Sequence, residues 1–299
     1  MEELKKIWLN GKFVDWQEAK THILTHTLHY GGGVFEGIRA YETKKGTAVF
    51  RLSEHIERFF YSASCLGMEI PFLPEEIKKA ILETIKVNKV KECYIRPIAF
   101  FGYGKMGLDP KGAPVNVAIA LWPWGAYLGK EITKVKISKF IRVHPLSTIP
   151  DAKLSGNYLN SILATLEAKK EGFDEALLLD WQGFVAEGPG ENIFMVKEKK
   201  LYTPAKGTIL PGITRASIIE IARDLGIKVK EKKITPKELK SANEAFFCGT
   251  AVEICPIGKI DDVLINRGKI GKITKRIKEV FTKVVRGEKK EYLKWLTFV

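Results

Sequence analysis

The sequence has 299 residues, of which 45% are apolar and 28% are charged, and this composition argues against a disordered chain. Its formal net charge of +14 at pH 7 is spread along the chain rather than gathered in blocks, as on a solvated surface. Nucleic acid, anionic substrates or a lysine-rich, heat-adapted composition would each explain such a charge. Because no nucleic-acid-binding module accompanies it, we expect no nucleic-acid partner.

The N-terminal stretch "MEELKKIWLNGKF" has no apolar core followed by a cleavage site, and the chain has no run of 18 or more apolar residues. These features predict a cytoplasmic protein with no membrane partner. The 4 cysteines occur without CxxC spacing, so we expect reduced and mostly buried thiols without a chemical role.

The first part of the chain, residues 1–122, predicts a small domain of mixed strands and helices. The alternating run "KIWLNGKFVD" around Asn10 and Gly11 predicts a β-hairpin. The segment from Ser53 to Gly67 has a capping residue, helical apolar spacing and a glycine stop, and therefore predicts a helix. The runs "CYIRPIAFFGYG" and "VNVAIALWPW" predict strands.

Three histidines, His22, His26 and His29, lie close together in "THILTHTLHYGGG". No acidic ligand accompanies them, and the alternation of the run predicts an extended segment rather than a helix. We therefore predict no metal site at these residues.

A break in the pattern, with Pro123, Gly125 and Gly129, predicts an interdomain linker over residues 123–135. The strand-rich run "KVKISKFIRV" follows, and we assign residues 136–299 to a second, larger domain. The expected fold class is mixed α/β (α+β), with a small N-terminal and a larger C-terminal domain.

One lysine, Lys153, stands in the polar stretch "DAKLSGNYLN", just before a predicted helix that ends near Gly172. Most lysines are surface charges, so this residue alone indicates no function. The apolar residues of the helix fall on one face at positions i, i+3, i+4 and i+7, namely Leu159, Ile162, Leu163 and Leu166.

The run "DEALLLDWQGFVAEGPGENIFMV" predicts a strand, a tight turn at Gln182 and Gly183, a second strand, a glycine-rich bend and a third strand. Further on, "LPGIT" leads into an amphipathic helix that begins after Gly212. The start of that helix offers unpaired N–H groups to a phosphate. The small-residue turn "CGTAVE" places Thr250 to contact the same anion, and Arg58 would add a charge-assisted bond.

These features indicate a use for the lysine. An amine held against a bound aldehyde cofactor can form a Schiff base, and a carboxylate that faces the cofactor ring nitrogen keeps that nitrogen protonated. Glu187, on the strand before "GPGEN", is the candidate carboxylate, with Glu191 as the alternative. Lys153 is the candidate amine.

Three stretches, "AKLSGNYLNSILATLEAKKEGFDEALLLD", "EGPGENIFMV" and "LPGITRASIIEIA", resemble the signature regions of the class IV aminotransferases, the fold-type-IV enzymes of pyridoxal phosphate (PLP). Within that class, "HYGGGVFEGIRAY", "YIRPIAF" and "PWGAYLG" are similar to the bacterial and archaeal branched-chain enzymes. The resemblance covers nearly the whole chain. It implies a two-domain fold-type-IV enzyme with PLP in the cleft between the domains.

The resemblance also implies a role for individual residues. Lys153 matches the lysine that holds PLP covalently and moves the proton between the substrate Cα and the cofactor C4′. Glu187 matches the partner of the pyridine nitrogen, and Tyr158 matches the partner of the phenolic oxygen. The residues that match the phosphate-binding positions are Arg58, Ile213, Thr214 and Thr250.

On the substrate side, the resemblance implies that Arg96 receives the distal carboxylate of glutamate and that Thr250 and Ala251 meet the α-carboxylate. The residues expected to line an apolar pocket are Tyr30, Phe35, Tyr94, Trp124, Tyr127 and Ala251. For each aromatic residue, packing in the core is the alternative.

The activity that the resemblance implies is reversible amino transfer between leucine, isoleucine or valine and 2-oxoglutarate, in a ping-pong cycle. A homo-oligomer is expected, with a dimer as its unit and a hexamer as one form, in which the partner subunit supplies some of these residues. The cofactor motifs alone leave open a D-amino acid aminotransferase and the lyase that forms 4-aminobenzoate. A nucleic-acid-binding protein on an inactive enzyme scaffold is disfavoured because every catalytic position is filled.

Overall fold

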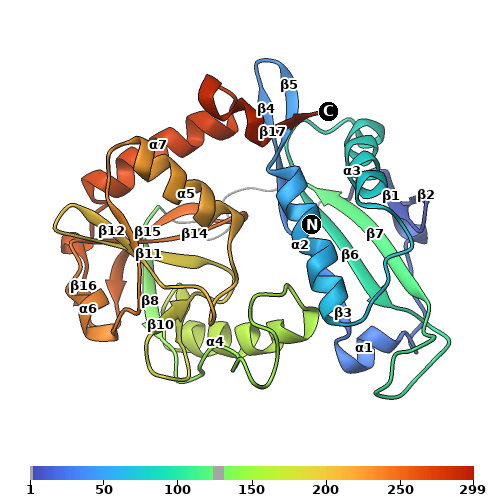
Figure 1. Cartoon of the computed structure of the whole chain (residues 1–299), viewed down its shortest axis with the longest axis horizontal. Helices are drawn as coiled ribbons and strands as arrows, with labels where there is room; N and C mark the ends of the chain where they lie inside the picture. Colours follow the sequence, from blue (N-terminus) through green and yellow to red (C-terminus); the bar gives the residue numbers. More distant parts are fainter. Residues whose placement is uncertain (1–2, 124–130) are drawn as a thin grey trace. The chain divides into compact units, whose positions relative to one another are not determined.

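The computed structural model describes residues 3–123 and 131–299 of the chain. The chain folds into two compact units. Unit 1 comprises Met1–Gly125, Ala152–Gly156 and Val284–Val299, and unit 2 comprises Ala126–Asp151 and Asn157–Lys283. Figure 1 colours these segments by sequence. The domain boundary at residues 123–135 stays a prediction.

Unit 1 contains an antiparallel sheet of eight strands. The strand order is β17 (Leu296–Phe298), β5 (Gly46–Phe50), β4 (Ile38–Thr43), β6 (Cys93–Phe101), β7 (Val115–Trp122), β1 (Lys6–Leu9) and β2 (Lys12–Asp15), and β3 (Gly33–Phe35) pairs with β6. The predicted hairpin is confirmed, since Leu9 pairs with Lys12 around Asn10 and Gly11. Both turn residues have positive φ, 48° and 89°, as a type I′ turn requires.

Two long helices belong to unit 1, α2 (Leu52–Cys65) and α3 (Pro74–Asn88). They pack against each other, α3 also contacts β1 and β7, and α2 contacts β3 (Figure 1). The helix predicted between Ser53 and Gly67 is thus confirmed as α2. One face of α2 is turned toward β3, and this face positions the polar residues described below.

The prediction of an extended segment around the three histidines is wrong. Residues His26–Tyr30 form the short helix α1, which Gly31 ends in a left-handed conformation with φ 71°. Period-two alternation over so few residues does not distinguish a strand from one helical turn. Nε2 of His26 lies 2.8 Å from the carbonyl oxygen of Gly107, and Nε2 of His29 lies 3.0 Å from that of Ile23.

Unit 2 contains a mixed sheet of nine strands. The order is β10 (Val185–Glu187), β9 (Glu175–Leu179), β8 (Thr133–Ile137), β15 (Glu253–Ile260), β14 (Glu244–Gly249), β11 (Asn192–Lys197), β12 (Lys200–Thr203) and β13 (Val229–Glu231), and β16 (Val263–Leu264) pairs with β15. The core of the sheet includes Phe194 and Phe246, which pair across β11 and β14 with their rings stacked 5.2 Å apart. The predicted turn at Gln182 and Gly183 is confirmed between β9 and β10.

The helices of this part of the chain are α4 (Tyr158–Lys170), α5 (Ile213–Asp224), α6 (Pro236–Lys240) and α7 (Lys272–Val285). The α4 and α5 helices begin where the sequence predicts them. The apolar face predicted for α4 is not its packing face, because Ala164 and Ala168 pack on Ala176 and Leu178. Small side chains one turn apart allow this close approach. The predicted apolar residues are exposed by 64%, 54%, 41% and 61% for Leu159, Ile162, Leu163 and Leu166.

Within residues 3–123 and 131–299, no helix has the length and apolar character needed to cross a membrane.

Candidate active site

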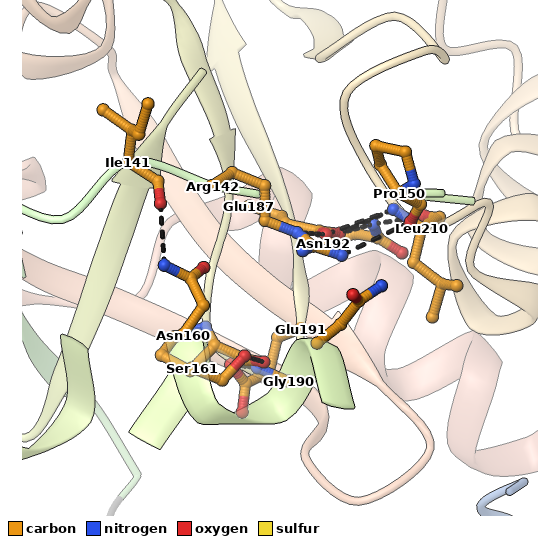
Figure 2. Close-up of polar contacts among 12 residues, drawn as sticks. Ile141, Arg142, Pro150, Asn160, Ser161, Glu187, Gly190, Glu191, Asn192 and Leu210 are labelled. Atoms are coloured by element: carbon orange, nitrogen blue, oxygen red, sulfur yellow. Dashed lines mark hydrogen bonds and ion pairs between the residues drawn. The ribbon is translucent and has the colours of Figure 1, made fainter. Parts of the chain in front are cut away.

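The carboxylate of Glu187 is the centre of a polar cluster in unit 2 (Figure 2). Glu187 ends β10 and is only 4% exposed. Its Oε1 accepts a bond from Nε of Arg142 at 2.5 Å, and its Oε2 accepts one from Nδ2 of Asn192 at 2.9 Å. The backbone N–H of Leu210 donates to both oxygens, at 3.1 and 3.2 Å. A buried carboxylate is costly unless it is paired and hydrogen-bonded, and these donors meet that requirement.

Backbone contacts hold the donors of this cluster in place. Arg142 donates through its backbone N–H to the carbonyl of Leu179 at 2.7 Å and through Nη2 to that of Pro150 at 3.3 Å. Nδ2 of Asn192 also donates to the carbonyl of Leu210 at 2.9 Å. A side chain at Gly212 would overlap the Asn192 amide oxygen, so this position must be glycine. The carboxylate is therefore linked to the residue at which α5 begins.

The N-terminus of α5 has the properties of an anion site. Gly212 is its N-cap residue and provides no side-chain cap, and both Ile213 and Thr214 are buried. The first N–H groups of a helix have no partner within it, and they lie at the positive end of the helix dipole. The turn that contains Thr250 and Ala251, both half-buried, follows β14 in the same unit.

Side chains near the start of α4 fix the surroundings of Tyr158, which is its first residue and is half-buried. Oγ of Ser161 donates to the carbonyl of Pro189 in the glycine-rich bend at 2.7 Å, and Nδ2 of Asn160 donates to the carbonyl of Ile141 at 2.9 Å (Figure 2). In the bend itself, the N–H of Gly190 donates to the Glu191 carboxylate at 3.1 Å. Glu191 thus stabilises the bend, which favours Glu187 as the partner of a cofactor.

Lys153 belongs to unit 1, in the short segment Ala152–Gly156. Its backbone N–H donates to Oγ of Ser62 on α2 at 2.9 Å, and its carbonyl accepts from the N–H of Phe35 at 3.3 Å. Its Nζ lies 5.0 Å from the centre of the Phe35 ring, within the range of a cation–π contact. The segment that carries the lysine is therefore hydrogen-bonded to both α2 and β3.

Arg58 of α2 is paired with the fully buried Glu36, with Nε to Oε1 at 2.6 Å and Nη2 to Oε2 at 2.9 Å. Nδ1 of His55 lies 2.7 Å from Oε2 of Glu36. Burial alone would raise the pKa of Glu36, but the positive charge of Arg58 and the hydrogen bonds from Arg58 and His55 outweigh it and hold the pKa well below its usual range. Burial lowers the pKa of His55 below its ordinary value, so the ring is neutral at pH 7 and donates Nδ1–H to the carboxylate.

Arg96 of β6 lies among aromatic rings in unit 1. Its guanidinium carbon is 4.6 Å from the centre of the Phe35 ring, 5.4 Å from that of Tyr94 and 5.5 Å from that of Trp122. Nη2 of Arg96 also donates to the Tyr94 hydroxyl at 3.4 Å. We call Arg96, Phe35, Tyr94 and Trp122 the Arg96 cluster. Phe35 thus contacts both Arg96 and Lys153.

Of the other aromatic residues predicted for the substrate pocket, the structure describes Tyr30. It lies at the end of α1, is 44% exposed and packs against His26 with ring centres 4.7 Å apart. Trp124 and Tyr127 lie outside the described residues. Sequence reasoning missed Trp122 in this group, although it ends the predicted strand "VNVAIALW".

The cysteines are free, and three of them are buried, as predicted. Burial raises the pKa of the Cys93 thiol to about 12 and raises that of Cys248 further still. Because the thiolate is the reactive form, neither side chain is a nucleophile at neutral pH.

Comparisons with known proteins agree with this architecture. Residues 33–260 match the family model described as amino-transferase class IV. The chain is 46% identical over 297 residues to the branched-chain-amino-acid aminotransferase of Pseudomonas aeruginosa, and the match covers 98% of this chain and 97% of that protein.

Two solved structures are similar at comparable identity. The branched-chain aminotransferase of the archaeon Thermoproteus uzoniensis, solved with norvaline, has a TM-score of 0.95 at 46% identity, covering 98% of this chain and 99% of that one. The T.th. branched-chain amino acid aminotransferase, complexed with N-(5'-phosphopyridoxyl)-L-glutamate, has a TM-score of 0.95 at 45% identity, covering 100% and 99%. The chain belongs to the class IV aminotransferases. Within that family, these three relatives are all branched-chain amino acid aminotransferases.

The bond from Lys153 to Ser62 gives a first prediction, on stability. We expect Ser62→Ala to lower the free energy of unfolding by about 1–3 kcal/mol, because it leaves the partly buried N–H of Lys153 without its acceptor. Ser64→Ala removes an exposed hydroxyl from the same helix and should change the free energy of unfolding by less than about 0.5 kcal/mol. Urea unfolding of both variants measures the difference, and equal effects would contradict the assigned role of Ser62.

Proposed function

We propose that the protein transfers amino groups reversibly between branched-chain L-amino acids (leucine, isoleucine and valine) and 2-oxoglutarate, with PLP as its cofactor. The observation that carries the substrate class is the Arg96 cluster, in which a single cation lies among three aromatic rings. Within the described residues, Arg96 has no carboxylate partner and its Nε has no hydrogen-bond acceptor. Such a site suits both an aliphatic side chain and the distal carboxylate of glutamate.

The residues of the chain fit PLP. The uncapped start of α5, with Ile213 and Thr214, together with Thr250 and Arg58, would hold its phosphate. The buried carboxylate of Glu187, held in position by Arg142 and Asn192, suits a protonated ring nitrogen.

Two further residues complete the proposed cofactor site. Tyr158 would donate to the phenolic oxygen of PLP, and Lys153 would bind its aldehyde carbon through Nζ. The T.th. enzyme, which was solved with a phosphopyridoxyl compound, supports this assignment.

PLP, when bound, supplies an electron-withdrawing ring that accepts the electron pair left on the substrate Cα after deprotonation. Once the substrate amine has replaced Lys153 on the aldehyde carbon, the freed Nζ would take that proton and deliver it to the cofactor C4′. Glu187 holds the proton on the pyridine nitrogen, and Arg142 and Asn192 hold Glu187 in position. Because these donors are fixed before the reaction, little reorganisation is needed when charge develops.

On the substrate side, Arg96 orients glutamate and 2-oxoglutarate through the distal carboxylate, and the N–H groups near Thr250 and Ala251 bind the α-carboxylate. Phe35 and Tyr94 provide apolar surface for an aliphatic chain, with further surface from Tyr30, Trp124 and Tyr127. The relative solved with norvaline, an unbranched aliphatic amino acid, supports an apolar side-chain site.

We also propose that the protein is a cytoplasmic homo-oligomer built from dimers. The exposed apolar side chains of α4, which include Leu159 and Leu166, support burial against another chain. Sedimentation of the purified protein at several concentrations measures the state of association.

The assignment of Lys153 predicts where the cofactor is attached. After borohydride reduction of the purified protein, we expect the pyridoxyl group on the peptide that contains Lys153. Lys153→Ala should lose this label and about 10²–10⁴-fold or more in turnover, while it retains PLP through the phosphate contacts. Peptide mapping by mass spectrometry checks the site, with the exposed Lys170→Ala as control. A label on any other lysine would show that the assignment is wrong.

The assignment of Glu187 predicts a loss of turnover that exceeds the loss of cofactor binding. Glu187→Gln keeps the shape of the side chain but cannot hold the proton on the ring nitrogen. Turnover should fall about 10²-fold or more, while bound PLP changes much less. The control is Glu191→Gln, since Glu191 serves the bend. If the control loses more turnover than Glu187→Gln, Glu191 is the residue that faces the ring.

The assignment of Arg96 predicts that glutamate and leucine respond differently. Arg96→Leu should reduce transition-state stabilisation in the glutamate and 2-oxoglutarate half-reactions by about 2–5 kcal/mol, the value of a buried charge pair. The leucine half-reaction should change much less. Single-turnover absorbance follows each half-reaction separately. Equal losses would show that Arg96 binds the α-carboxylate or holds the fold. Faster turnover of D-alanine than of L-leucine would overturn the substrate class.

A further inference from the structure

Glu36 has no place among the residues proposed to touch the cofactor or the substrate, yet its carboxylate is fully buried and paired. The Glu36 cluster consists of Glu36, His55 and Arg58. All three residues belong to unit 1, and the carboxylate is 0% exposed. Four donors reach its two oxygens: Nε and Nη2 of Arg58, Nδ1 of His55 and the N–H of Gly37, the last at 3.2 Å.

The sequence places these residues together in two steps. His55, Arg58 and Ser62 are separated by three and four residues, so they lie on one face of α2. Glu36 directly follows β3, and its backbone N–H donates to the carbonyl of Pro97 on β6 at 2.9 Å. The carboxylate is therefore held on a strand of the sheet, while the two cationic or polar partners are held on a helix.

The bonds to Glu36 restrict the orientation of the Arg58 guanidinium. An arginine side chain has several rotatable bonds, and a planar fork that is bonded at two points keeps little of that rotational freedom. Glu36 uses Nε–H and one N–H of Nη2, two of the five N–H groups of a guanidinium. Because the guanidinium is planar, these bonds also fix the direction of its edge that carries Nη1.

His55 in turn keeps Glu36 in place. Its ring is buried and neutral, and it donates Nδ1–H to the oxygen that also accepts from Nη2 of Arg58. The charge of the cluster is therefore balanced by one carboxylate and one guanidinium. If the Glu36–Arg58 pair served folding alone, its two charges would have to cancel. The guanidinium edge that carries Nη1 would not have to point in a fixed direction.

We propose that Glu36 is a positioning residue, which fixes the Arg58 guanidinium for the phosphate group of the cofactor. The inference rests on the proposed function, in which Arg58 contacts that phosphate. It adds that the orientation of Arg58 depends on Glu36 and, through it, on His55. The phosphate affinity of the chain is therefore set partly by a residue that does not touch the phosphate.

The test compares PLP with pyridoxal, which lacks the phosphate. Both are titrated into the full-length apoprotein, and absorbance gives the dissociation constants. We expect Glu36→Gln to raise the dissociation constant of PLP by about 5- to 100-fold, the range for coupled residues of one network. The dissociation constant of pyridoxal should change by less than about 2-fold. In an Arg58→Ala background, Glu36→Gln should have no further effect on PLP.

A matched control is available in the same unit. Glu92 is an acid with two arginine partners, Arg286 at 2.6 Å and Arg39 at 3.3 Å, and it lies outside the proposed site. Glu92→Gln should leave the ratio of the PLP and pyridoxal constants unchanged. If Glu36→Gln destabilises the fold, Glu36→Asp keeps the charge but moves the carboxylate back by one methylene, and it should weaken PLP by an intermediate amount.

Three results with the Glu36 variants would overturn the inference. They are equal weakening of PLP and pyridoxal, no weakening of either by Glu36→Gln or Glu36→Asp, and an undiminished effect of Glu36→Gln in the Arg58→Ala background. Failure of the proposed function is distinguishable, since the unsubstituted protein would then not bind PLP or would not transfer an amino group from leucine. If Arg58→Ala alone leaves the ratio unchanged, Arg58 does not contact the phosphate, and the inference is wrong for that reason.

Discussion

A buried carboxylate must be paired, and this constraint fixes the candidate site in each unit. Glu187 and Glu36 are almost fully buried, and an unpaired charge at either position would cost at least several kcal/mol, on the order of a large part of the stability of a domain. Arg142 pairs with Glu187, and Arg58 pairs with Glu36. In both cases the donors come from segments that are distant in the sequence. Since separation of either arginine from its acid would leave a buried charge without its partner, these segments are held at fixed positions.

The parts of the fold that the sequence predicts correctly are those with local causes. Asn10 and Gly11 adopt positive φ and so determine their hairpin, and Gly212 marks the start of α5. The pairing of β17 with β5, about 250 residues apart, has no local signal. The four apolar residues predicted to share a face of α4 are exposed, whereas Ala164 and Ala168 make the intramolecular contact. Periodicity shows which residues share a face, and it does not show whether the same chain covers that face.

The same distinction applies to the candidate site. Lys153 and Glu187 stand beside recognisable motifs, so the sequence indicates them directly. The sequence does not indicate their supporting residues, because Arg142 and Ser62 act through contacts that only the tertiary structure creates. One signal was available: polar residues at His55, Arg58 and Ser62 on one face of a helix otherwise rich in apolar residues. A polar stripe of this kind predicts a buried partner such as Glu36, but it does not say which acid of the chain provides it.

The Arg96 cluster shows how one site can serve two chemically different substrates. An acidic partner for Arg96 would compete with the distal carboxylate of glutamate, and an arginine without any compensation would disfavour an aliphatic side chain beside it. The three ring faces provide partial compensation, about 0.5–2 kcal/mol each, which is less than a carboxylate would provide. Under the proposed function, the cation would therefore be stable enough to lie beside leucine and would still gain by binding glutamate. Because Phe35 contacts both Arg96 and Lys153, the same ring would also place the substrate side chain relative to the proposed catalytic amine.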